Sequence, residues 1–185
     1  GFNGMIGVVN DYENIDKQFS LSEDAGVPVG KYRFTQFQTH LHTAASKRLV
    51  MNLDGFAGGF YDGHLLSFVL TPQWNIGSSL QLSLAYEYDR VSFPGRDQDF
   101  TGNIARFKAL YMFSTKLSVS SFVQYNSHEN NLTTNLRIHY NPREGNDFYV
   151  VFNESSNTKR DLQTPRLPGF NNRSVLLKYT YTFIL

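Results

Sequence analysis

Two histidines stand out among the residues of this sequence that could bind a metal ion. His40 and His42 are two residues apart, so on a β-strand both imidazoles would point to the same face, as two ligands of one ion do. No third ligand lies close to them in the sequence. We therefore expect ordinary polar-face histidines, with neither a metal nor another cofactor.

Carboxylates are the second candidates, because glycoside hydrolysis uses a pair of them. Glu87 and Asp89 would share one strand face, and Asp54 and Asp62 are further candidates. A water-filled interior needs such charges without any catalysis. The chain also has no cysteine and no G-x-S-x-G turn, which excludes thiolate catalysis and gives no sign of a serine nucleophile. We predict that the protein is not an enzyme, and an envelope hydrolase remains an alternative.

A set of charged residues on polar strand faces is the most promising functional feature. Rings of such charges determine which solutes pass or bind in a pore, although paired charges can also simply fill and stiffen an interior. The candidates, expected to line a lumen, are Asp54, Glu87, Asp89, Arg106, Lys108, Arg137, His139 and Lys178.

The elements that must position these charges are strands, because apolar and polar residues alternate almost throughout the chain. Leu80, Leu82, Leu84, Tyr86 and Tyr88, for example, would share one face. This period of two predicts strands and argues against helices. We expect nine good strands and a weaker tenth at 2–9, the nine lying at about 31–43, 47–60, 64–76, 79–91, 100–114, 116–127, 131–141, 146–156 and 172–185.

Strand length and connection length both indicate a membrane protein. Most of the predicted strands have about 11 residues or more, whereas about 9–11 suffice for a tilted strand to cross a bilayer. The connections are expected to alternate between tight turns and longer loops, as in outer-membrane barrels. The longest is segment 10–30, which we predict to be an extracellular loop. This alternation would place the C-terminus on the short-turn, periplasmic side.

The composition fits a barrel that needs aromatic rings at the membrane boundaries. Aromatic residues make up 15% of the 185 residues, and many lie near the ends of the predicted strands. The net charge of +1 gives no basic surface for nucleic acid. The predicted fold class is all-β, an antiparallel up-and-down transmembrane β-barrel. The alternative is a soluble carbohydrate-binding β-sandwich, because strands alternate in the same way there.

The stretch FVQYNSHENNLTTNLRIHYNPREGNDFYVVFNE (122–154) resembles the C-terminal barrel domain of a Gram-negative outer-membrane family of unknown function. VPVGKYRFTQFQ (27–38), GGFYDGH (58–64) and RSVLLKYTYTF (173–183) are also similar and follow in the expected order. Proteins of that family carry an N-terminal carbohydrate-binding module of family-nine type. The family's barrel is longer than this chain. The resemblance therefore implies that residues 1–185 are the C-terminal portion of a larger barrel.

The resemblance also implies a location, a set of partners and a role. The expected location is the bacterial outer membrane, with lipid and lipopolysaccharide around the barrel. The role is that of a pore or membrane anchor in glycan binding or uptake through an upstream module, with glycans as possible partners and no nucleic acid. The final strand resembles the C-terminal signal read by the barrel-assembly machinery, carried here by Tyr179, Tyr181 and Phe183.

Overall fold

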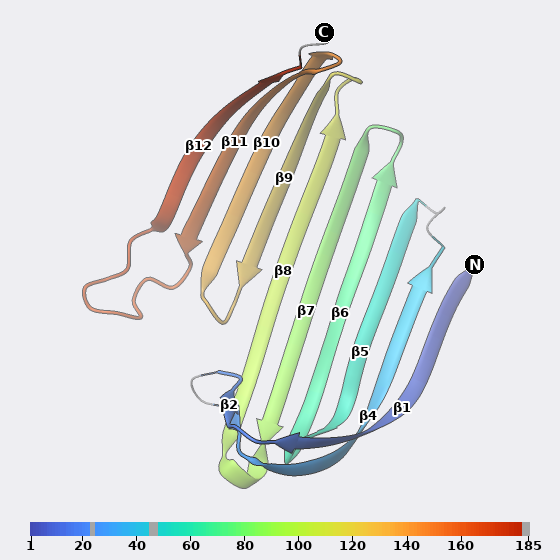
Figure 1. Ribbon diagram of the computed structural model, residues 1–185, viewed down its shortest axis with the longest axis vertical. Helices are drawn as coiled ribbons and strands as arrows, with labels where there is room; N and C mark the ends of the chain where they lie inside the picture. The colour runs from blue at the N-terminus through green and yellow to red at the C-terminus, as the bar shows by residue number, and fades with distance from the viewer. Residues whose placement is uncertain (23–24, 45–47, 183–185) are drawn as a thin grey trace. The chain divides into compact units, whose positions relative to one another are not determined.

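The computed structural model describes residues 1–22, 25–44 and 48–182, and β-strands dominate these ranges. Ten strands form one antiparallel sheet with the order β1-β4-β5-β6-β7-β8-β9-β10-β11-β12 (Figure 1). Each strand of this sheet pairs with the next one along the chain. The separate β2–β3 pair lies between β1 and β4 in the sequence. No helix in the described part is long and apolar enough to cross a membrane. The bounds are β1 Phe2–Ile15, β2 Phe19–Ser20, β3 Gly26–Val27, β4 Gly30–Thr43, β5 Leu49–Phe60, β6 Gly63–Ile76, β7 Leu80–Phe93, β8 Gln98–Met112, β9 Leu117–Asn126, β10 Asn131–Arg143, β11 Asn146–Asn157 and β12 Phe170–Tyr181.

The predicted fold class, an all-β antiparallel up-and-down arrangement, is confirmed, and all ten predicted strands are present. The prediction was wrong about the start of the first loop. Strand β1 continues to Ile15, which is paired with Gly30, so the excursion comprises residues 16–29 rather than 10–30. The reason is that β1 hydrogen-bonds along all of β4, and this long-range pairing extends a strand whose own alternation is weak.

The expected alternation of short and long connections holds only in part. The connection between β5 and β6 is just Tyr61 and Asp62, as short as the β10–β11 turn at residues 144–145. The β7–β8 connection comprises residues 94–97 and is shorter than the expected 92–99, because β7 continues to Phe93 and β8 begins at Gln98. Pro94–Arg96 forms a 3-10 turn between the two strands. Among the connections between neighbouring strands of the large sheet that the structure describes in whole or in part, the long ones are 16–29 and 158–169.

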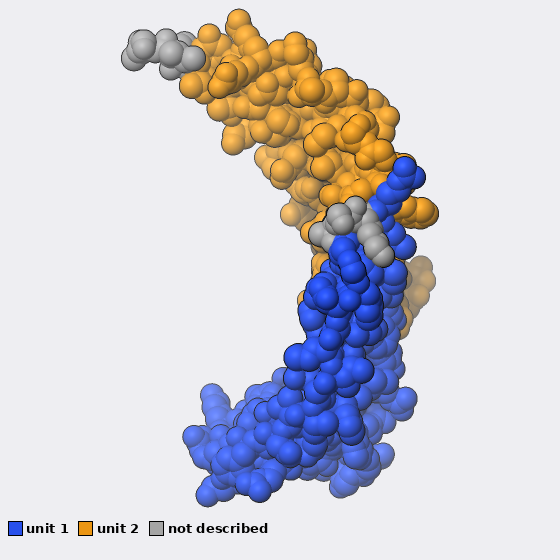
Figure 2. Space-filling model, turned by 90° about the vertical axis from the view of Figure 1, so that its right-hand side faces the viewer, with its two compact units in different colours: residues 1–71, 86–103 blue, residues 72–85, 104–185 orange. Residues whose placement is uncertain are grey.

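The chain divides into two compact units, which Figure 2 shows in different colours. Unit 1 comprises residues 1–71 and 86–103, and unit 2 comprises residues 72–85 and 104–185. Each unit is described below by itself.

Unit 1 contains a small apolar core, to which segment 16–29 and strand β7 contribute. Ala25 and Val27 of this segment are buried against Val91 and Phe93 of β7. Val91 and Phe93 follow Asp89 in steps of two, so they share its strand face. Ala25 and Val27 of segment 16–29 therefore lie against the face of β7 that carries Glu87 and Asp89, the polar face of unit 1.

A close backbone approach at Gly63 supports this core. A Cβ atom added to Gly63 would lie 2.1 Å from the Ser92 carbonyl oxygen and 2.6 Å from the Phe93 ring. We expect Gly63→Ala to destabilise the folded protein by about 1–3 kcal/mol through overpacking. Urea titration of the folded fraction would measure this loss. Gly95→Ala is the matched control, because a Cβ atom there meets nothing within 4 Å, and equal stability of the two variants would contradict the prediction.

The strands of unit 2 have one apolar face and one polar face, both defined by the strand register. The apolar face of unit 2 consists of cross-strand rows over β10, β11 and β12, with an aromatic row next to the β10–β11 turn. Its members are Leu136, Phe152 and Val175, then Ile138, Val150 and Leu177, then Tyr140, Phe148 and Tyr179. The polar face of unit 2 carries the intervening residues, among them Asn135, Arg137, His139, Asn153, Ser174 and Lys178.

Candidate functional site

The five basic candidates from the sequence all lie on the polar face of unit 2. Arg106 and Lys108 of β8 are paired with Gln124 and Phe122 of β9. Strand β9 in turn pairs with β10, which brings Arg137 and His139 onto the same face, and β12 adds Lys178 opposite Tyr149. The strand register thus places residues far apart in sequence on one surface.

Two of these side chains have specific polar partners within unit 2. The Arg106 Nε donates a hydrogen bond to Gln124 Oε1 at 3.1 Å. His139 Nε2 lies 2.7 Å from the Asp147 carboxylate, and its ring stacks on Tyr149 with centroids 4.3 Å apart. His139 is therefore held in a fixed orientation at the edge of the basic set.

The other three cations, Lys108, Arg137 and Lys178, are exposed and surround two shallow hollows. Arg137 and Lys108 line one hollow together with Asn135. Arg137 and Lys178 line a second one, next to Tyr149. Among the described residues, no carboxylate lies within 4.0 Å of any of the three charged groups. Such an arrangement can attract and bind anions.

The three acidic candidates belong to unit 1. Asp54 is paired in register with His40, and its carboxylate contacts the His40 Nδ1. Asp89 accepts a hydrogen bond of 2.6 Å from the Ser67 hydroxyl, and Glu87 shares its strand face. The rings of His40 and His42 are 5.5 Å apart, and the described residues contain no group of three side chains suited to a metal ion.

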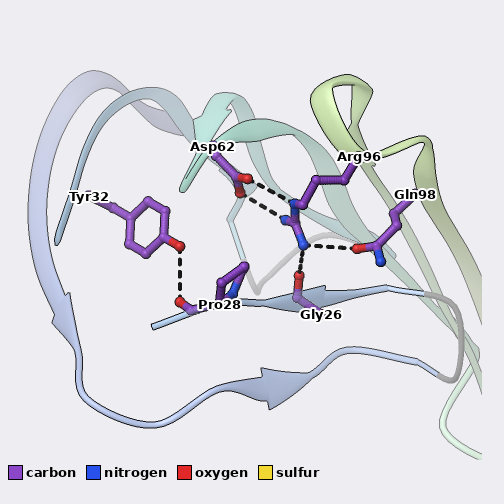
Figure 3. Close-up of polar contacts among 6 residues, drawn as sticks. All are labelled: Gly26, Pro28, Tyr32, Asp62, Arg96 and Gln98. Carbon is purple, nitrogen blue, oxygen red and sulfur yellow. Dashed lines mark hydrogen bonds and ion pairs between the residues drawn. The ribbon is translucent and has the colours of Figure 1, made fainter. Parts of the chain in front are cut away.

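Arg96 is the centre of a polar cluster in unit 1 (Figure 3). It was not among the candidates from the sequence. Its guanidinium donates to both oxygens of Asp62, at 2.9 and 2.8 Å, and to the Gly26 carbonyl and Gln98 Oε1. It also lies 4.0 Å from the centre of the Phe93 ring. Arg96 thus ties segment 16–29 to the β5–β6 and β7–β8 connections.

Two tyrosines of unit 1, Tyr32 and Tyr61, also form hydrogen bonds near segment 16–29. Tyr32 donates a hydrogen bond to the Pro28 carbonyl at 2.9 Å, which holds the end of segment 16–29 (Figure 3). Tyr61 donates to Glu13 at 2.8 Å. Burial, and then this hydrogen bond to the carboxylate, raise the pKa of Tyr61 to about 12, so the phenol stays neutral at physiological pH.

The sequence could not reveal the Arg96 cluster, because its contacts are remote along the chain. Gly26 lies 70 positions from Arg96, and Asp62 lies 34 positions from it. The available signal was the P-G-R-D stretch at 94–97, which predicts a turn with charged residues but no partner for the arginine.

The residues of the predicted assembly signal lie on the last strand. Tyr179 and Tyr181 of β12 share one strand face, where their partners are Phe148 and Asn146. Phe183 lies outside the described residues. Their role as a signal stays a prediction.

Comparisons with known proteins assign no family to this chain. No protein-family profile matches the chain, and no curated protein matches it. A solved structure of the NanC porin, in a rhombohedral crystal form, is similar with a TM-score of 0.47 and 8% sequence identity, and 98% of each chain is covered. At this level the likeness is too weak to assign a pore or a function to this chain.

Proposed function

We propose that this chain is the membrane-spanning part of an outer-membrane β-barrel that acts as a pore or membrane anchor. The observation that carries the proposal is the pair of unlike faces in unit 2. None of the three rows of the apolar face contains a charged residue, and the face remains exposed, with Val175 and Leu177 at 64% and 69%. Lipid is the environment in which such a face is stable.

A soluble carbohydrate-binding sandwich is the weaker alternative. In a sandwich, a second sheet covers the apolar face and the two inner faces form a shared core. The buried apolar residues among those described are Ala25, Val27, Phe34, Val91 and Phe93, all of which belong to unit 1. The described strands of unit 2 therefore have no such core, which favours the membrane protein.

The aromatic row supports the same proposal. Tyr140, Phe148 and Tyr179 lie side by side at the end of the apolar face, next to the β10–β11 turn. Aromatic residues gather at the membrane–water boundary, where the ring is in an apolar layer and a hydroxyl reaches water. We assign this row to the periplasmic boundary, with the C-terminus on that side.

The proposed context follows from the resemblance of segments 27–38, 58–64, 122–154 and 173–183 to the outer-membrane family with an upstream carbohydrate-binding module. In that context the barrel takes part in glycan binding or uptake, and lipid, lipopolysaccharide and the assembly machinery are its partners. We infer a non-enzymatic role. Asp89, one of the two carboxylates considered for hydrolysis, accepts a hydrogen bond from the Ser67 hydroxyl.

The single tryptophan of the chain allows a direct test of lipid contact. Gln73 and Asn75 hydrogen-bond to each other, and Asn75 to Gln81 on the polar side, so Trp74 between them points to the opposite face, where it is 55% exposed. We expect phosphatidylcholine with brominated acyl chains to quench the Trp74 fluorescence of the protein reconstituted in vesicles. A soluble sandwich would show no quenching.

Two relocated tryptophans provide the control. In a Trp74→Phe background, Leu177→Trp places the reporter on the apolar face and Leu176→Trp places it on the polar face. Quenching of the first variant and not of the second is the expected result. Equal quenching of both, or none in either, would contradict the proposed membrane-facing surface.

A further inference from the structure

We propose that Lys108, Arg137 and Lys178 form an anion-binding row on the polar face of unit 2, selecting small solutes that carry carboxylate or phosphate groups. The inference rests on the proposed pore function and names its solute class. It begins from the register. Lys108 lies level with Asn135 through Phe122, and Arg137 is two residues further along β10. Arg137 lies level with Leu176 through Val151, and Lys178 is two residues further along β12.

The spacing of the row allows neighbouring cations to bind a small anion between them, or several anions to bind along the row. Each step crosses two strand separations of about 4.8 Å and two residues of about 3.4 Å each, so successive Cα atoms are roughly 12 Å apart. Lysine and arginine side chains extend far enough to approach one another across such a step. The row is diagonal, and Arg137 at its centre lines both hollows.

The charge balance of this face favours anions. In the strands of unit 2 the acidic residues are Asp147 and Glu154. Glu154 contacts Arg173 and shares its register position, on the opposite face from Arg137. Asp147 is on the polar face, two residues from Tyr149, but its carboxylate is bound by His139 at 2.7 Å and by Asn141 at 2.9 Å. Asp147 also interacts electrostatically with Lys178, but over more than 4.0 Å. Lys108, Arg137 and Lys178 are thus exposed, and among the described residues no carboxylate lies within 4.0 Å of them.

The neighbours of the row suit an organic anion better than a bare ion. Asn135 and Ser120 line the same hollow as Lys108 and Arg137, and they can bond to hydroxyl or carbonyl groups. Arginine binds carboxylate and phosphate through two parallel hydrogen bonds, whereas lysine acts as a point charge. Arg137 would orient the anionic group, and Lys108 and Lys178 would attract it from either side.

Ion selectivity of the full-length protein in planar bilayers tests this row. We expect the wild type to prefer chloride over potassium in a salt gradient. The triple variant Lys108→Gln, Arg137→Gln, Lys178→Gln should lose about threefold or more of that chloride-to-potassium permeability ratio. The control removes the same number of charges from loop 158–169, as Lys159→Gln, Arg160→Gln and Arg166→Gln, and should retain most of it.

Binding in detergent provides a readout that does not need a pore. In calorimetric titrations, citrate and pyrophosphate should bind the wild type and the loop control, and bind the row variant about tenfold more weakly. Any binding of glucose, which is uncharged, should be the same in the wild type and the row variant. Citrate alone or pyrophosphate alone would identify a carboxylate or a phosphate solute. Unboiled gel migration would confirm that each variant is folded.

The outcomes separate the two proposals. Absence of conductance from the wild type would contradict the pore and leave the citrate and pyrophosphate titrations to decide the anion site. A conducting, cation-selective wild type would overturn the row alone. So would equal anion binding by the wild type and the row variant.

Discussion

Leu177→Arg is expected to reduce the stability of the membrane-inserted protein by about 2–4 kcal/mol, the cost of an arginine on the lipid face near the bilayer midplane. Leu177 is 69% exposed, and its row on the apolar face continues through Val150 to Ile138. In water, a cation at such an exposed position would cost almost nothing. Urea titration in lipid vesicles, with the unboiled gel band as a measure of the folded fraction, would determine the loss.

Leu176→Arg is the matched control for this experiment. Leu176 is the adjacent residue, of the same type and also exposed, but it lies on the polar face, level with Val151 and Arg137. We expect a loss below about 1 kcal/mol, from repulsion by neighbouring cations in a water-filled space. If both arginines cost the same, the apolar face of unit 2 is not in contact with lipid.

Arg96→Met is expected to release segment 16–29 from the polar face of unit 1. The substitution keeps an apolar chain over Phe93 but removes the hydrogen bonds to Asp62, Gln98 and the Gly26 carbonyl. Because the ion pair is partly exposed, at 23% for Arg96 and 37% for Asp62, we expect a loss of about 2–3 kcal/mol, below that of a fully buried pair. Trypsin cleavage after Lys17, within the segment, should accelerate strongly.

An exposed arginine pair serves as the comparison for Arg96. Arg166 contacts Asp161 in loop 158–169, with the two side chains 63% and 75% exposed. Arg166→Met should change the stability by less than about 0.5 kcal/mol and leave cleavage after Lys17 unchanged. A wild-type cleavage rate in the Arg96 variant would show that the apolar contacts of Ala25 and Val27 hold the segment without the arginine.

A consequence for the proposed pore follows from the position of this segment. The expected extracellular loop 10–30 contains segment 16–29, whose Ala25 and Val27 pack against the face of β7 that carries Asp89. In a barrel, a loop in this position narrows the water-filled path. The Arg96 variant would then also conduct differently from the wild type, in a direction that depends on how far the released segment moves.

The strands and their faces could be predicted from the sequence, because the side-chain period of two is a local property. The expected strand at 131–141 extends to Arg143 in the structure, and the one at 100–114 begins at Gln98. The same period placed Arg106, Lys108, Arg137, His139 and Lys178 on polar faces. Alternation shows which face a residue is on, but not which residue lies opposite it on the neighbouring strand. The strand register, seen only in the structure, places these five residues on one surface.

The tertiary structure alone decided the fold of segment 16–29, the length of the connections and the Arg96 cluster. Strand β1 reaches Ile15 because β4 offers partners along its full length. Arg96 meets Gly26 across 70 positions of sequence. Such contacts form only when the folded chain brings a strand end, a turn and a loop close together in space. A local pattern of residue types does not predict that proximity. The sequence by itself determined which residues alternate; the pairing of strands determined which of them meet.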